Sequence, residues 1–313
     1  MSTNTDTNPQ GAVTGLEKRI EQLRDGMGVF KGDRLGQIGI GLLVMFVFVG
    51  VFARPISIEF LNITIPGLAP HDPNARAVGG RLEPPSLAHP LGTTQLGRDV
   101  FSQLIAGTRV TLLVGSLAAF MAVFIGTNVG LISAYYGGWV DDVLMRITDI
   151  VYAVPFLPFA IVLVAIAGSS IVNIIGAIVL ILWRSTARVI RSQVLSHKQR
   201  PYVESAEAIG ASDVRIMYKH ILPNVLPLAF LYAAFAVGYA VIAEASLSFL
   251  GFGDPNMLSW GEMIFTVYSA DAIRQAWWWV FPPGIAITLF VMSVFFIGRT
   301  LEKVINPELR HQE

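Results

Sequence analysis

The chain has 313 residues, of which 53% are hydrophobic and only 14% are charged, and its mean hydropathy is +0.59. This composition is too apolar for a soluble domain of this size and is typical of a membrane protein. The formal net charge is +0, which gives no indication of a nucleic-acid partner, and the absence of cysteine excludes disulfides, thiolate metal sites and cysteine nucleophiles.

The first apolar segment, residues 35–53, carries no charge and lies between Arg34 and Arg54. A helix of this length covers roughly 28 Å, which is the thickness of one hydrocarbon core. We expect a true membrane span rather than a cleaved signal peptide, because a long polar stretch precedes it and no small-x-small cleavage site follows.

Charge-free runs predict the remaining spans. Residues 110–134 form the second. The run 150–183 would measure about 50 Å as a helix, too long for one span, and the Gly168-Ser169-Ser170 break divides it into a third and a fourth, the latter extending to about Val194. Residues 226–249 and 280–298 complete an all-α membrane protein with six transmembrane helices.

Three arginines occupy one face of the fourth predicted span. Arg184, Arg188 and Arg191 follow one another at helical spacing. We expect this face either to extend its guanidinium groups to the lipid headgroups or to meet a partner.

The distribution of Lys and Arg predicts the orientation. With the amino terminus in the cytoplasm, sixteen of the 22 basic residues fall on inner segments and six on outer ones, as the positive-inside rule favours. We expect both termini in the cytoplasm. The predicted parts are a cytoplasmic tail 1–34, a first helix 35–53, an outer loop 54–101, a five-helix core 102–301 with a cytoplasmic coupling loop 196–223, and a cytoplasmic tail 302–313.

The most informative segment is the polar stretch from Tyr202 to Lys219. Its small residues allow another surface to approach the backbone closely, as between packed helices. Gly210 marks the end of one short helix, Ser212 or Asp213 caps the next, and Pro223 is expected to stop it. The residues predict a rigid helix-turn-helix projection that can transmit force between a soluble motor and the spans.

This segment resembles the loop by which permease subunits of ABC importers bind their ATPase subunits. The residues that fill the pattern, or lie within it, are Glu204, Ser205, Ala206, Ala208, Gly210, Asp213, Leu222 and Pro223, with Ser205 in place of the first alanine of a Glu-Ala-Ala triplet.

The resemblance extends over about residues 35–300. The chain resembles the second permease subunit of the dipeptide, oligopeptide and nickel importer family. This resemblance implies the type I ABC importer permease fold. The segments that carry it are His89–Val100, Gly107–Arg109, Tyr136–Asp141 and Ile242–Gly251.

The resemblance implies a non-enzymatic subunit that moves di- or oligopeptides across a prokaryotic cell membrane by ATP-driven alternating access. It implies a homologous second permease, two ABC ATPases and an extracytoplasmic substrate-binding protein as partners. The chain has no Gly-x-x-x-x-Gly-Lys-Ser/Thr motif, so we expect no cofactor in this chain, with ATP and Mg²⁺ held by the ATPases.

Three alternatives stay open. The same permease could import oligosaccharides, or nickel and other metal chelates, since the external binding protein selects the substrate. A stand-alone secondary transporter would need carboxylates deep in the spans, and the sequence offers chiefly Glu244.

Four other residues are candidates for local roles. Glu244, near the outer end of the fifth span, is expected to be structural or gating, with a hydrogen bond to Ser246 or Ser248. Arg98 and Asp99 precede the second span and are possible outer-gate residues or part of a helix-start network. Asp149 is expected to pair with Arg146 one turn away.

We expect no metal site. The five histidines are scattered in the sequence, without any pair at ligand spacing, and are expected to be unrelated. They are His71, His89, His197, His220 and His311.

Overall fold

The computed structural model describes residues 28–58, 63–65 and 67–305, and for the two strands the backbone alone. The predicted tails lie largely outside this range, and so does His311. The helices are α2 (Arg34–Val51), α3 (Val100–Tyr136), α4 (Gly138–Ala153), α5 (Phe156–Ala167), α6 (Ile171–Lys198), α7 (Pro201–Ala208), α8 (Asp213–Arg215), α9 (Leu222–Leu247), α10 (Trp260–Ser269) and α11 (Trp277–Ile305). Two π-helical segments, Ile216–Ile221 and Ser248–Phe252, adjoin α9 at its two ends.

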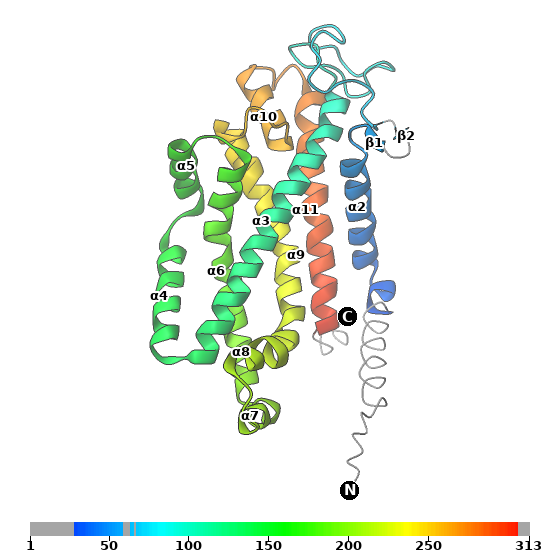
Figure 1. The fold of residues 1–313 in the computed structure, drawn as a ribbon. Coiled ribbons are helices and arrows are strands. Elements are labelled where there is room, and N and C mark those ends of the chain that lie inside the picture. Colours follow the sequence, from blue (N-terminus) through cyan, green and yellow to red (C-terminus); the bar gives the residue numbers. More distant parts are fainter. Residues whose placement is uncertain (1–27, 59–62, 66, 306–313) are drawn as a thin grey trace.

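The long helices form one bundle (Figure 1). Five helical stretches in the described residues are long and apolar enough to cross a membrane: α2, α3, α6, α9 with its flanking π-helices and α8, and α11. The predicted all-α architecture is confirmed, apart from one antiparallel hairpin of β1 (Ile56–Ile58) and β2 (Ile63–Ile65).

The predicted third span differs from the structure. It is not one helix beginning at residue 150 but the pair α4 and α5, which are bent by 91° relative to each other. Pro155 causes the break, because it lacks an N–H and disfavours helical backbone at Val154, which is extended with ψ 121°. The pair runs from the lower to the upper end of the bundle in Figure 1 and so makes a sixth, broken crossing.

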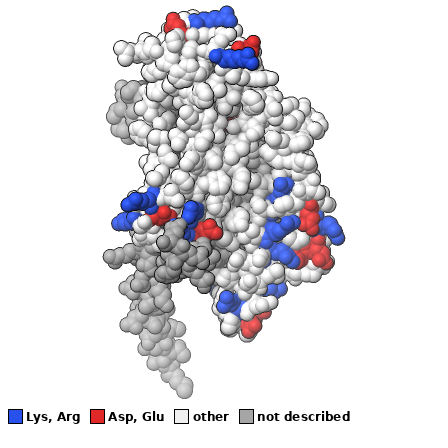
Figure 2. All heavy atoms as spheres, turned by 180° about the vertical axis from the view of Figure 1, so that it is seen from behind, with Lys and Arg blue, Asp and Glu red and all other residues white. Residues whose placement is uncertain are grey.

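Charged side chains gather at the two ends of the molecule. On the face shown in Figure 2, Lys, Arg, Asp and Glu form an upper and a lower group, with a wide band of other residues between them. A band without ionised groups is what a hydrocarbon core requires, because each charge placed there is costly.

The centre of the bundle is the crossing of α3 and α6. Gly126 and Gly130 lie one turn apart on α3, against the backbone of α6. A Cβ added at Gly126 would lie 2.5 Å from the Trp183 carbonyl oxygen, and one at Gly130 would overlap the Ala187 carbonyl oxygen. Small residues at this crossing let the two backbones approach, which is the main source of helix association inside a bilayer.

The first span is fastened to the last. Asp33 caps α2 by accepting from the Leu35 N–H, and its Oδ2 accepts a hydrogen bond of 2.8 Å from the Thr300 hydroxyl on α11. Gly36 and Gly39 face α11 closely, since a Cβ at either would lie within 3 Å of an α11 atom. These contacts place the start of α2 and the end of α11 at the same end of the bundle, where α7 also lies (Figure 1).

Candidate functional site

The predicted projection is helix α7 and the turn that follows it, at the lower end of the bundle (Figure 1). Pro201 occupies the first turn, where its missing N–H costs nothing. The helix ends in a complete Schellman motif: the Gly210 N–H bonds to the Glu207 carbonyl at 2.9 Å, and the Ala211 N–H bonds to the Ala206 carbonyl at 3.0 Å. Gly210 has φ +77°, a conformation that other L-residues adopt at a cost.

One side of α7 is buried against the bundle. Val203 is fully buried and Ala206 nearly so. Both belong to a hydrophobic cluster whose other members come from α3, α6, the π-helix after α8, and α9, among them Leu131, Ile190, Ile216 and Val225. A displacement of α7 would therefore press on the ends of three long helices at once.

The opposite side of α7 faces outward. Glu204, Ser205, Ala208 and Gly210 are exposed. Ile209, in the turn, has 84% of its surface exposed. Ala206, one of the residues that fill the pattern of the ATPase-binding loop, faces inward instead. We call the exposed set Glu204, Ser205, Ala208, Ile209 and Gly210 the α7 rim.

The segment after the turn differs from the prediction. Ser212 is the N-cap residue of α8, as expected, but Pro223 does not stop the helix that follows. The chain continues through the π-helix into α9, and Pro223 lies in the first turn of α9, where Leu222 N–H bonds to the Met217 carbonyl. A π-turn widens the backbone and so accommodates a proline without a break. Leu222 packs partly buried against the same cluster as Val203.

Asp213 connects this segment to the second span. Its Oδ1 accepts a hydrogen bond of 3.0 Å from the Tyr135 hydroxyl at the end of α3, and the Tyr135 carbonyl in turn accepts 2.6 Å from Lys198 Nζ of α6. The role of Asp213 is thus to hold α8 against the bundle as well as to begin it.

The arginine face of α6 meets α4. Arg191 forms a bidentate ion pair with Asp141. Arg188 binds Asp149 at 2.8 Å, and Arg184 donates a hydrogen bond of 2.6 Å to the Val151 carbonyl. The expected pairing of Asp149 with Arg146 is therefore wrong. The sequence showed only the local i, i+3 partner, whereas the packing of α4 beside α6 brings its acidic residues to the α6 arginines.

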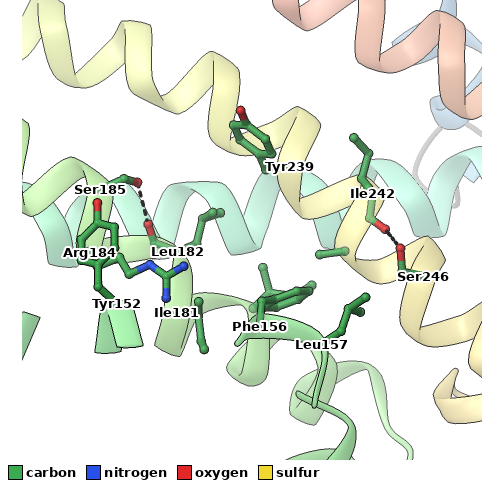
Figure 3. A pocket seen from close by; sticks show the side chains of 12 residues that line it. Tyr152, Phe156, Leu157, Ile181, Leu182, Arg184, Ser185, Tyr239, Ile242 and Ser246 are labelled. Carbon is green, nitrogen blue, oxygen red and sulfur yellow. Dashed lines mark hydrogen bonds between the residues drawn. The ribbon is translucent and has the colours of Figure 1, made fainter. Parts of the chain in front are cut away.

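An apolar pocket of about 460 Å³ opens between α4, α5, α6 and α9 (Figure 3). Phe156 and Leu157 come from the start of α5, Leu182 from α6, and Tyr239 and Ile242 from α9. Arg184, stacked 4.7 Å from the Tyr152 ring, is the charged group in its lining. The bend between α4 and α5 creates this opening.

The outer-end candidates are separate from the projection. Asp99 is the N-cap of α3, fully buried, and accepts from the Ser102 N–H at 2.8 Å. Arg98 lines a pocket of about 220 Å³ together with Glu262, and its buried Nε has no hydrogen-bond partner among the described residues. Glu244 is buried and accepts 2.7 Å from the Ser248 hydroxyl, one of the two partners expected for it.

Two histidines that we expected to be unrelated lie side by side. The rings of His71 and His89 are 5.2 Å apart, and both face Asp99. Eighteen positions separate them in a segment without regular structure, so no periodicity in the sequence brings them together.

The family model for "Binding-protein-dependent transport system inner membrane component" matches residues 126–311. The chain belongs to this family. The match includes α7 and its turn, the α6 arginines and the last span.

Curated relatives cover nearly the whole chain. The dipeptide transport system permease protein DppC of Alkalihalophilus pseudofirmus is 34% identical over 93% of this chain and 91% of its own length. The oligopeptide transport system permease protein OppC of Bacillus subtilis is 33% identical over 94% and 92%. The glutathione transport system permease protein GsiD of Pectobacterium atrosepticum is 38% identical over 73% and 75%. The resemblance to peptide-type importer permeases is thereby confirmed.

A solved structure supports the fold. A chain from the MetNI methionine ABC transporter in an inward-facing conformation superposes with a TM-score of 0.52 at 18% identity, over 66% of this chain and 95% of that one. The family match and the curated relatives show that the protein is a multi-span inner-membrane permease subunit of the ABC importer type. Membership of this family implies ATPase and substrate-binding partners.

Proposed function

We propose that this permease imports di- or oligopeptides by ATP-driven alternating access, with the α7 rim as the docking site of an ATPase subunit. The proposal rests on the difference between the two sides of α7, one exposed and the other buried. The α7 rim is exposed and includes Ile209, while Val203 and Ala206 on the other side are buried against three long helices.

Docking at the rim would convert a movement of the ATPase into a movement of the spans. The Schellman turn and the buried pair make α7 a rigid piece, because its backbone groups are satisfied and its apolar side is packed. The π-helix between α8 and α9 is the natural place for α9 to change direction, since π-turns recur at functional bends.

The orientation follows from the same assignment. ATP is cytoplasmic, so the rim end of the bundle faces the cytoplasm, and so do both termini. The opposite end, with the 67–99 segment and α10, faces a substrate-binding protein outside. One homologous permease and two ATPases complete the assembly. Peptides are the substrate class because the permeases named above carry dipeptide, oligopeptide or glutathione in their names.

The experiment substitutes Gly210 and measures uptake by the reconstituted transporter. Apart from its two chain neighbours, no residue that the structure describes lies within 4 Å of a Cβ built on Gly210, so a side chain there starts into open space. Gly210→Trp should leave insertion intact and reduce ATP-dependent uptake about tenfold or more, which corresponds to about 1.4 kcal/mol of docking free energy.

Two matched variants separate bulk from backbone strain. Gly210→Ala brings the positive-φ strain of about 1–2 kcal/mol without the bulk, and Gly210→Asn brings little strain, because Asn tolerates this conformation, with a side chain much smaller than that of Trp. We expect Gly210→Asn to transport nearly normally and Gly210→Ala to fall between the two. Wild-type uptake by Gly210→Trp would overturn the docking assignment.

Gentle purification from native membranes tests the assembly and the substrate. Mass spectrometry should find P-loop ATPases, a second permease and a binding protein, and the ligand on that binding protein should be a peptide. A chain that is recovered alone and transports without ATP would contradict the proposal.

A further inference from the structure

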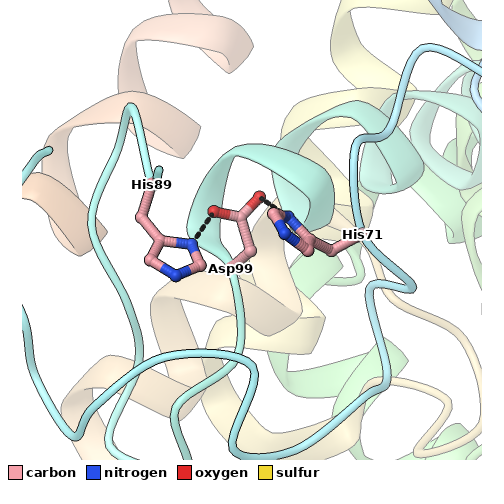
Figure 4. Close-up of side chains that lie close together, drawn as sticks. All are labelled: His71, His89 and Asp99. Carbon is pink, nitrogen blue, oxygen red and sulfur yellow. Dashed lines mark hydrogen bonds and ion pairs between the residues drawn. The ribbon is translucent and has the colours of Figure 1, made fainter. Parts of the chain in front are cut away.

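The end of the bundle opposite the α7 rim carries a cluster of two imidazoles and one carboxylate (Figure 4). Asp99 lies between His71 and His89, with 3.0 Å from its Oδ1 to His89 Nδ1 and 3.8 Å from its Oδ2 to His71 Nδ1. One ligand atom from each residue lies within 4.8 Å of the other two. We propose that these three residues bind a divalent transition-metal ion of the Zn²⁺ type.

The donor set and its dimensions fit such an ion. Zn²⁺ binds imidazole nitrogen and carboxylate oxygen at about 2.0–2.2 Å in tetrahedral geometry, which places neighbouring ligand atoms about 3.4 Å apart. Each imidazole is close to this spacing from a different oxygen of Asp99: His89 Nδ1 lies 3.0 Å from Oδ1, and His71 Nδ1 lies 3.8 Å from Oδ2. Two nitrogens and one oxygen also favour a borderline metal over Mg²⁺ or Ca²⁺, which prefer all-oxygen sites.

The cluster contains an unsatisfied donor or acceptor that a metal would satisfy. His71 Nδ1 is buried and has no hydrogen-bond partner among the described residues. Asp99 is fully buried and is held by hydrogen bonds from Ser102 and His89, but no cationic side chain is recorded against its carboxylate among the described residues. A cation between the three residues would neutralise the carboxylate and give His71 Nδ1 a ligand bond.

A second layer of contacts already orients the three residues. The Ser102 hydroxyl donates 2.6 Å to Asp99 Oδ2 and accepts 3.1 Å from the His71 backbone N–H. Gln103 Nε2 donates 3.2 Å to the Pro73 carbonyl and holds the His71 loop against α3. Hydrogen bonds of this kind typically fix metal ligands in place.

Metal binding would change the tautomer of His89 and leave one coordination position open. An ionised carboxylate only accepts hydrogen bonds, so His89 Nδ1 carries a proton in the structure, and an ion bound at Nδ1 would leave the imidazole proton on Nε2. Three protein ligands leave a fourth position for water or a group from a partner, and His71, with 33% of its side chain exposed, provides access. The ion would join two loop residues to the first turn of α3.

The test uses the full chain, purified in detergent with a tag that contains no histidine and stripped with a chelator. Equilibrium dialysis against micromolar Zn²⁺ should load one ion per chain, and Zn²⁺ should raise the midpoint of thermal unfolding. His71→Ala should bind no Zn²⁺ at this concentration and show no shift. His197→Ala, which removes a histidine from the other end of the bundle, should behave as the wild type.

Cobalt provides a readout that does not depend on the variants. Co²⁺ bound in tetrahedral geometry gives strong visible absorption bands, which should appear as the ion is loaded onto the chain. A wild-type chain without these bands, or equal Zn²⁺ uptake by the wild type and His71→Ala, would overturn the metal site. The result is independent of peptide transport, since neither assay involves the ATPases.

Discussion

The close approach of α3 to α6 at Gly130 predicts how a substitution there changes the stability of the fold. Gly130 on α3 faces the α6 backbone: an added Cβ would overlap the Ala187 carbonyl oxygen and lie 2.9 Å from the Arg191 nitrogen and 3.0 Å from the Ile190 Cβ. Two of these three atoms are backbone, so no rotamer change relieves the contact. Gly130→Ala must therefore push the two helices apart.

The size of the effect follows from two opposing terms. Replacing Gly by Ala inside a helix gains about 0.5–1 kcal/mol, whereas overpacking a well-packed site costs about 1–3 kcal/mol. We expect Gly130→Ala to lower the free energy of unfolding by about 1 kcal/mol or more. Gly176 is the matched control: it lies within α6, and outside its own helix turn no described residue is within 4 Å of its Cβ position, so Gly176→Ala keeps only the gain.

The assay is thermal unfolding of both variants in detergent, followed by tryptophan fluorescence. Trp183, one of six tryptophans in the chain, lies at the same crossing and contributes to this signal. The two chemically identical substitutions should differ by about 2 kcal/mol, or roughly 4 °C in the unfolding midpoint. If Gly130→Ala were as stable as Gly176→Ala, the close α3–α6 packing would be refuted.

Two further substitutions test local electrostatics and hydrogen bonding. Burial, together with the nearby Glu244 carboxylate, raises the pKa of Glu262 to about 7, so the stability that this group contributes is present below about pH 4.5 and is lost as pH rises through 7. Glu262→Gln should be more stable than the wild type at pH 8 and equal to it at pH 4.5 in thermal unfolding, and an equal difference at both pH values would contradict this. Tyr135→Phe removes the hydrogen bond to Asp213 and should lower the free energy of unfolding by about 1 kcal/mol, and an unchanged midpoint would rule out a contribution from that bond.

The sequence was sufficient to predict most of the spans because their signals are local. The charge-free runs, the Gly168-Ser169-Ser170 break and the extension of the fourth span beyond Arg184 all appear in the structure. The bend at Pro155 was missed because an apolar run contains no charge that marks where a helix changes direction. Proline in a membrane helix is tolerated often enough that its presence alone does not predict a 91° bend.

The candidate sites also differ in whether local or long-range contacts determine them. The turn at Gly210 depends on residues within a few positions of one another, and its capping was predictable. The pairing of Asp149 with Arg188 and the meeting of His71 with His89 depend on how distant segments pack. Both required the three-dimensional structure, because helix spacing describes only partners three or four residues apart.

The central claim is that the α7 rim contacts an ATPase, and the absence of cysteine makes it directly testable. Ile209→Cys places a unique thiol on the rim, and Leu87→Cys places one at the opposite end, where Leu87 is fully exposed. With a photoactivatable thiol reagent in native membranes, Ile209→Cys should crosslink to an ATPase subunit and Leu87→Cys should not. An Ile209→Cys chain that labels no ATPase, or labels it no more than Leu87→Cys does, would contradict the account.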